Sequence, residues 1–106
     1  MITIDDFRKI ELKIATIKEV LDHPNADRLY VIKVSLGAEE RQVVAGIKAY
    51  YKPEELVGKQ VVLVSNLESA LLRGVESQGM ILAASDVNGV RILIPGQPME
   101  LGSIVK

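Results

Sequence analysis

The sequence contains no cysteine and only one histidine, His23. Without cysteine the chain can form no disulfide framework, thiolate nucleophile or zinc knuckle, and a single histidine leaves no second or third ligand for a metal site. His23 precedes Pro24 in a stretch that is typical of a turn, and no nucleophile and base stand in a recognisable pattern. We therefore expect a protein without catalytic residues, metal or cofactor.

The sequence also lacks a strong net charge and a long hydrophobic run. Its formal net charge is −1, so any binding of nucleic acid must rest on a local cluster of basic residues. Nine of the 13 basic residues lie within the first 53 positions, but eight acids accompany them, which favours a mixed, solvated surface. The longest apolar runs are too short to span a membrane, and no signal peptide opens the chain. We expect a cytoplasmic protein that makes no membrane contact.

What the sequence does contain is a hydrophobic pattern of alternating β-strands. Its 106 residues predict one domain over the whole chain, 1–106. A short helix is expected over 5–10 as a plug, with Phe7 and Ile10 facing the core, and a second helix begins at Pro53 and ends at Gly58. Strands are predicted over residues 12–20, 29–36, 41–47, 60–65 and 79–84, with a loop over 67–78 and a last short strand over 90–94.

Three strands, a short helix and two more strands are the element order of a five-stranded OB-fold barrel. The predicted fold class is therefore all-β. An SH3-like barrel has a similar number of strands, but it lacks a helical element between the third and fourth strands. In an OB-fold, one strand face and the loops at one rim bind oligonucleotides or sugars, which predicts a recognition surface.

Polar and flexible residues at strand ends are the first candidates for that surface. Asn66, Ser77 and Met80 are placed where the mouth of a barrel would present them to a partner. Each also has a plainer interpretation: Asn66 and Ser77 could satisfy loop backbone groups, and Met80 could fill a gap in the core. Lys13, Lys33 and Arg41 could converge on one barrel wall as phosphate contacts.

Seven sequence blocks, in order along the whole chain, resemble the tRNA-binding domain family, an OB-fold module of methionyl-tRNA synthetases and of free-standing tRNA-binding proteins. The first four blocks are Asp6-Phe7 with Leu12-Lys13-Ile14-Ala15-Thr16-Ile17, His23-Pro24-Asn25-Ala26-Asp27-Arg28-Leu29-Tyr30, Arg41-Gln42-Val43-Val44-Ala45-Gly46-Ile47 and Tyr51-Lys52-Pro53-Glu54-Glu55-Leu56. The last three are Gly58-Lys59, Ser65-Asn66-Leu67 and Ser77-Gln78-Gly79-Met80. The common Arg-Val-Gly of the family's first strand stands here as Lys13-Ile14-Ala15, which keeps the charge but loses the guanidinium fork.

The resemblance implies a non-catalytic module that recognises the folded shape of tRNA and raises the tRNA affinity of methionyl-tRNA synthetase. It implies RNA contacts from Asn66, Ser77 and Met80. Basic residues of the strand wall are implicated too, with Lys33 and Arg41 as the best matches and Lys13, Lys48 and Arg73 as further ones. The expected partners are therefore tRNA and the methionyl-tRNA synthetase catalytic chain.

The resemblance also implies a homodimer formed through a C-terminal extension, here residues 90–106. The extension carries more apolar side chains than a small barrel readily buries, although it could instead pack on its own barrel. The alternative functions are a free-standing tRNA-binding protein and a peptide-binding export chaperone of the same fold. The chaperones generally lack an intact His-Pro-x-Ala-Asp-x-Leu block, which is complete here as residues 23–29.

Overall fold

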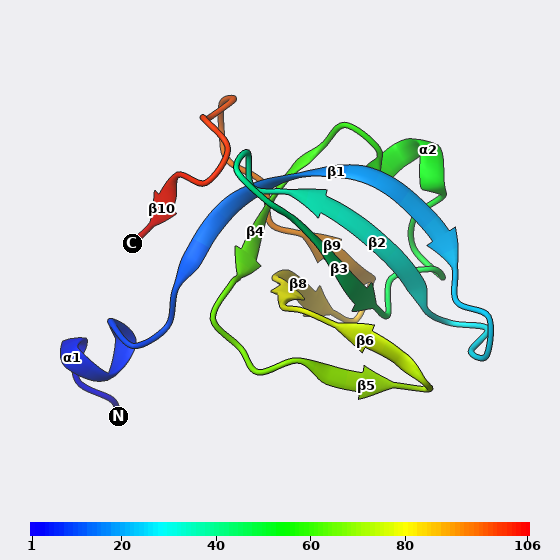
Figure 1. Cartoon of the computed structure of the whole chain (residues 1–106), viewed down its shortest axis with the longest axis horizontal. Coiled ribbons are helices and arrows are strands. Elements are labelled where there is room, and N and C mark those ends of the chain that lie inside the picture. Colours follow the sequence, from blue (N-terminus) through cyan, green and yellow to red (C-terminus); the bar gives the residue numbers. More distant parts are fainter.

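The computed structural model describes residues 1–106 as an antiparallel barrel with two one-turn helices (Figure 1). The helices are α1 (Ile4–Phe7) and α2 (Pro53–Leu56). The barrel strands are β1 (Leu12–Asp22), β2 (Tyr30–Ser35), β3 (Glu40–Ala45), β4 (Gln60–Val64) and β7 (Met80–Ile81). The remaining strands are β5 (Ala70–Leu72), β6 (Val75–Ser77), β8 (Ala83–Asp86), β9 (Gly89–Ile92) and β10 (Ile104–Val105).

The main sheet closes on itself almost completely. Its strand order is β3-β2-β1-β4-β7, with β10 added beside β1, and all its pairs are antiparallel. A β-bulge between Ile17 and Glu19 interrupts the pairing of β1 with β2, and bulges of this kind bend a strand. β1 can therefore pair with β2 at one end and with β4 and β10 at the other. The expectation of an OB-type barrel is confirmed.

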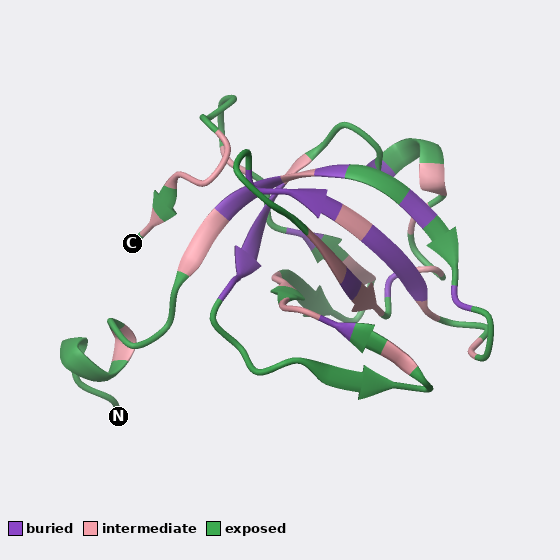
Figure 2. Cartoon of the chain, in the orientation of Figure 1, coloured by how far each residue is buried: buried purple, intermediate pink, exposed green.

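The interior is filled by aliphatic side chains from the barrel strands and α2. The ribbon is purple in Figure 2 where residues are buried. Ile17, Ile32 and Leu63 have no exposed surface at all. Leu56 of α2 is equally buried, so this short helix fills the core from one end. The predicted helix start at Pro53 and the stop at Gly58 are confirmed, and Gly58 has a φ of 90° that favours glycine.

Strict alternation along the first strand does not hold, because Ile14 and Ala15 are both buried. The C-terminal segment lies beside these residues, at the edge of β1. The Ile14 N–H donates to the Ser103 carbonyl at 2.9 Å, and the Gly102 N–H donates to the Ile14 carbonyl at 2.8 Å. The C-terminal segment therefore extends the sheet at this end of β1.

The prediction that the first helix plugs the barrel is wrong. α1 is stabilised locally by a capping box between Thr3 and Asp6, but none of its residues is buried, and Figure 1 shows it projecting away from the barrel. Phe7 is half-buried and Ile10 is 45% exposed. The N-terminal segment is therefore an arm beside the barrel rather than part of its core.

Two strand predictions also need correction. The predicted 67–78 loop contains the β5–β6 hairpin, whose two-residue turn is Arg73-Gly74, with φ of 54° and 88°. Positive φ at both positions is typical of a type I′ hairpin turn. The predicted strand over 79–84 is divided into β7 and β8, and the last predicted strand is β9, which pairs with β8 around the turn Val87-Asn88 rather than around Asn88-Gly89.

Candidate nucleic-acid interface

Lys13, Arg41 and Lys33, which lie on β1, β3 and β2, are joined by a continuous chain of polar contacts. Lys13 Nζ lies 3.1 Å from Glu11 Oε1, and the same carboxylate oxygen accepts a bond from Ser65 Oγ at 2.7 Å. The Ser65 carbonyl in turn accepts a bond from the Arg41 guanidinium.

Two glutamines complete this chain. Arg41 also donates to the Gln78 carbonyl at 3.4 Å, and Gln78 Oε1 accepts from the Gln42 N–H at 3.0 Å. Gln42 Oε1 accepts from Lys33 Nζ at 2.8 Å. The predicted convergence of three cations on one barrel wall therefore has a physical basis, which sequence alone did not show. We name the chain of residues 11, 13, 33, 41, 42, 65 and 78 the polar network.

The charged residues of the polar network differ in how many partners already hold them. Lys13 and Lys33 are half-buried, and each ammonium group has one polar partner, while Arg41 is held by two carbonyls and by Glu39 at 3.1 Å. The bond from Ser65 and the neighbouring Lys13 hold the pKa of the Glu11 carboxyl below its ordinary value of 4.5. Glu11 is therefore ionised at neutral pH, and it offsets part of the positive charge.

Met80 lies at the edge of the polar network and, like Asn66, is exposed. It pairs with Val64 at the end of β4, and 47% of its surface is exposed. Gly79 makes this pairing possible, because a Cβ at that position would lie 2.8 Å from the Val64 carbonyl oxygen. The interpretation of Met80 as a core residue is not supported by this exposure.

Asn66 is exposed, but its side-chain amide is fully engaged with the N-terminal arm. Asn66 Oδ1 accepts from the Glu11 N–H at 2.8 Å, and Nδ2 donates to the Lys9 carbonyl at 2.7 Å. The interpretation that Asn66 satisfies backbone groups therefore describes what the side chain does in this structure.

Ser77 is buried, with 3% of its surface exposed, and its hydroxyl is also fully engaged. Ser77 Oγ accepts from the Val44 N–H at 3.0 Å and donates to the Gly79 carbonyl at 3.0 Å. These bonds join β6 to β3 and thereby help to close the barrel. An RNA contact from Ser77 stays a prediction, and it would require these bonds to be exchanged.

Lys48 and Arg73 do not join the polar network. Lys48 pairs with Asp22 at 3.1 Å, at the end of β1 opposite to Lys13. Arg73 lies in the turn of the β5–β6 hairpin, where its carbonyl accepts from Asn25 Nδ2 at 3.2 Å. The structure therefore divides the predicted basic residues into two separate groups.

His23 is a structural residue of the turn after β1. Its ring is buried, Nδ1 accepts from the Asn25 N–H at 2.9 Å, and Nε2 therefore carries the proton that is donated to the Leu72 carbonyl at 2.8 Å. The turn and the β5–β6 hairpin are joined through this ring. No group of three or more His, Cys, Asp and Glu side chains is arranged to hold a metal ion, and no helix has the length and apolarity needed to cross a membrane.

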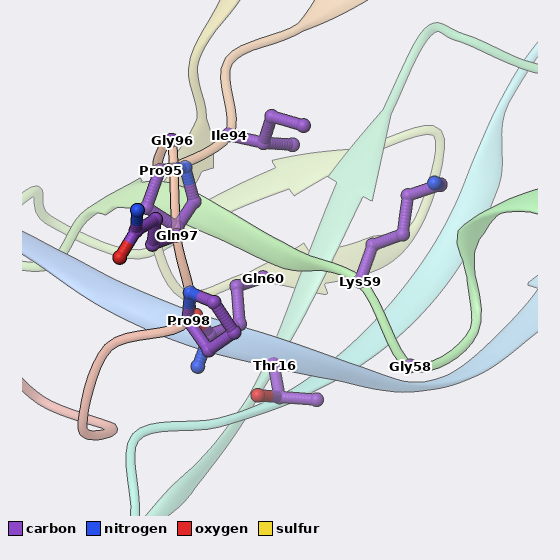
Figure 3. A pocket seen from close by; sticks show the side chains of 9 residues that line it. All are labelled: Thr16, Gly58, Lys59, Gln60, Ile94, Pro95, Gly96, Gln97 and Pro98. Atoms are coloured by element: carbon purple, nitrogen blue, oxygen red, sulfur yellow. The ribbon is translucent and has the colours of Figure 1, made fainter.

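A pocket of about 380 Å³ lies on a different part of the barrel, between β1, the start of β4 and the C-terminal segment (Figure 3). Its lining includes Thr16, Lys59, Gln60 and Ile94, and none of the predicted site residues. Gln60 holds the segment in place by a pair of bonds to the Met99 backbone, at 2.6 and 2.8 Å. The pocket therefore belongs to the attachment of the C-terminal segment and not to the polar network.

Sequence reasoning missed Glu11, Gln42, Ser65 and Gln78 as members of the polar network. Gln42, Ser65 and Gln78 lie inside the motif blocks, and their place in those blocks was the available signal. Their pairing depends on contact between β3 and the segment after β6, which are 36 residues apart, and no local pattern reports it.

Comparison with known proteins identifies the family. Residues 12–104 match the family described as "Putative tRNA binding domain". The chain belongs to the tRNA-binding domain family. The methionine–tRNA ligase of Thermococcus kodakarensis is 56% identical over 105 residues, which is 99% of this chain and 14% of the ligase. The domain thus spans about one seventh of the length of the curated relatives it matches.

Solved structures of the tRNA-binding domain fold superpose closely on this domain. A MetRS-related protein from Pyrococcus horikoshii has a TM-score of 0.93 and 33% identity, covering 100% of this chain and 98% of that chain. The CsaA chaperone protein from Picrophilus torridus has a TM-score of 0.92 and 30% identity, and each chain is covered completely. The family and its fold are therefore shared by proteins described as synthetase-related and as chaperones.

Proposed function

We propose that this domain binds folded tRNA and raises the affinity of a methionyl-tRNA synthetase for its substrate. Membership of the tRNA-binding domain family carries the proposal, and the 56% identity to a methionine–tRNA ligase supports the link to that enzyme. In this proposal the domain itself performs no chemistry and acts in the cytoplasm beside the synthetase catalytic chain, as part of the same polypeptide or as a separate subunit.

The RNA-binding surface in this proposal is the polar network together with Met80. Lys13 and Lys33 supply phosphate contacts, and Arg41 adds positive potential from a half-buried position. Met80 offers a flexible, polarizable side chain to a sugar or an unstacked base. Lys48 and Arg73 lie away from this surface and would contact a separate stretch of a ligand as large as tRNA.

Asn66 serves this surface by fixing the arm that carries Glu11, whereas Ser77 serves the stability of the barrel by joining β6 to β3. In this proposal the ammonium groups contact phosphates and the thioether packs on a sugar or base, so the domain recognises the shape of the RNA rather than its sequence.

A dimer of this domain is also proposed, through the C-terminal extension 90–106. The extension packs on its own barrel through its backbone, yet it leaves apolar side chains exposed at Leu93, Ile94, Met99 and Ile104. Leu101 instead packs beside Gly37, and Ile92 is buried. Sedimentation of the unsubstituted chain and of Ile94→Asp tests this proposal: the first should be a dimer and the second a monomer, and a monomeric unsubstituted chain would refute it.

Fluorescence anisotropy with three labelled ligands tests the main proposal. Folded tRNA, an unstructured RNA of equal length and a hydrophobic peptide are titrated with the domain at two salt concentrations. We expect a salt-sensitive preference for folded tRNA. Peptide binding without RNA binding would instead assign the domain to the chaperone branch, which the similarity to the CsaA protein makes the second candidate.

A further inference from the structure

A second pocket, of about 340 Å³, lies between the end of α1, the start of β1 and β10. Figure 1 shows α1 and β10 on the same side of the barrel. Three basic residues line this pocket, Arg8, Lys9 and Lys13, against one acid, Glu11. Lys13 and Glu11 also belong to the polar network, so the pocket extends that surface onto the N-terminal arm.

Each of the three cations has an acidic neighbour, but the partners of Arg8 and Lys9 stand outside the pocket. Asp5 and Asp6 pair with Arg8 at 3.4 Å and with Lys9 at 3.6 Å, but neither acid lines the pocket. Arg8 and Lys9 side chains are 71% and 79% exposed, and ion pairs this exposed are weak and easily exchanged. Glu11 is occupied by the Ser65 hydroxyl and by Lys13. A phosphate entering the pocket can therefore replace the carboxylate partners of Arg8 and Lys9.

Asn66 positions the backbone of the arm that carries Arg8 and Lys9. Its amide accepts from the N–H of Glu11 and donates to the carbonyl of Lys9, so it holds the backbone on both sides of Ile10. These two contacts bridge 55 and 57 residues of sequence. α1 has no buried residue that could hold the arm by packing. The two hydrogen bonds of Asn66 therefore help to fix the arm to the barrel.

We infer that Arg8 and Lys9 bind the phosphodiester backbone of tRNA together with Lys13, and that Asn66 is the positioning residue that holds them there. The inference rests on the proposed function, and it adds two contacts on the arm that the motif blocks do not contain. It also assigns Asn66 a role exerted through the arm rather than by touching RNA.

The first test is the double variant Arg8→Gln/Lys9→Gln, with Lys18→Gln/Lys59→Gln as a matched control. Lys18 and Lys59 are exposed, belong to no ion pair and do not line this pocket. For each cation removed from the arm, we expect the affinity for folded tRNA at 0.1 M salt to fall about five- to eightfold, and the salt slope to become shallower by about 0.7 to 0.9. The control should stay close to the unsubstituted chain.

A double-mutant cycle tests the positioning role of Asn66. Asn66→Ala should weaken tRNA binding, and Arg8→Gln/Lys9→Gln should add little further loss in the Asn66→Ala background, because the arm is already displaced. If Asn66 touched RNA independently, the two fold-changes would multiply. Multiplying effects would therefore overturn the positioning role, while circular dichroism confirms that each variant is folded.

The outcomes separate this inference from the proposed function. If the unsubstituted domain does not bind tRNA, both are overturned. If it binds and Arg8→Gln/Lys9→Gln binds equally well, or if the control loses as much, only the phosphate site on the arm is overturned. Sedimentation of the same samples detects the remaining contrary case, in which the double variant loses affinity because it no longer dimerises.

Discussion

Replacing Ser77 by alanine should destabilise the barrel while leaving the tRNA affinity of the folded domain unchanged. The substitution removes the acceptor of the Val44 N–H and the donor to the Gly79 carbonyl. Leaving buried polar groups without partners costs about 1–3 kcal/mol, so we expect a loss near 2 kcal/mol. Domains of about this size lose roughly 4–8 °C in Tm per kcal/mol, which makes the change easy to measure.

Thermal and urea unfolding measure this loss, with Ser85→Ala as the control. Ser85 is exposed on β8 and its hydroxyl makes no hydrogen bond, so its replacement should change the free energy of unfolding by no more than about 0.5 kcal/mol. Affinity for tRNA is then measured well below both unfolding temperatures. At that temperature Ser77→Ala and Ser85→Ala should bind equally.

The opposite pattern would refute this reasoning. If Ser77→Ala kept its stability and lost tRNA affinity, the hydroxyl would have to leave Val44 and Gly79 to contact RNA. The bonds seen in the unbound domain would then not describe what Ser77 does in the complex.

Three further predictions concern the polar network and its edge. Met80→Ala should weaken tRNA binding with little change in Tm, because Met80 is half exposed; a large drop in Tm would return it to the core. Lys33→Ala should weaken binding of all tRNAs about equally and make the salt slope shallower by about 0.7 to 0.9, and an unchanged slope would remove Lys33 from the phosphate contacts. Because folding lowers the pKa of Glu11, its contribution to stability is present above pH 4.5 and is lost as the pH falls through the lower folded value. An NMR titration of this carboxyl should show that lowered pKa, and Ser65→Ala should raise it; no change would refute the role of the Ser65 bond.

Local signals predicted much of the fold. Pro53 followed by two acids indicated the position of α2 because these residues stabilise the first turn of a helix by themselves. The strands β2, β3 and β4 were predicted within one or two residues because β2 and β4 are buried over most of their length and β3 carries the buried Val43 within an apolar run.

The β5–β6 hairpin was missed because its turn carries an unusual residue. Type I′ turns favour Asn-Gly or Asp-Gly, and here Arg73 adopts the positive φ instead. The neighbouring Ala70, Leu71 and Leu72 are all apolar, so they do not alternate with polar residues, and all three are exposed. Nothing in the local pattern therefore distinguished this strand from a loop.

The sequence predicted candidate residues for the site, but not their contacts or their exposure. The motif blocks indicated Asn66, Ser77 and Met80 together, yet only the tertiary contacts separate the accessible thioether from the two engaged side chains. The partners of Asn66 lie more than 50 residues away along the chain. No periodicity or spacing carries that information.

The most direct test of the account is an NMR titration of the isotope-labelled domain with folded tRNA. The account predicts that the backbone amides of Lys13, Lys33 and Met80 shift or broaden, and that those around Lys59 at the pocket of Figure 3 do not. Changes confined to that pocket, or no changes with saturating tRNA, would contradict the claim that the polar network and Met80 form the RNA-binding surface.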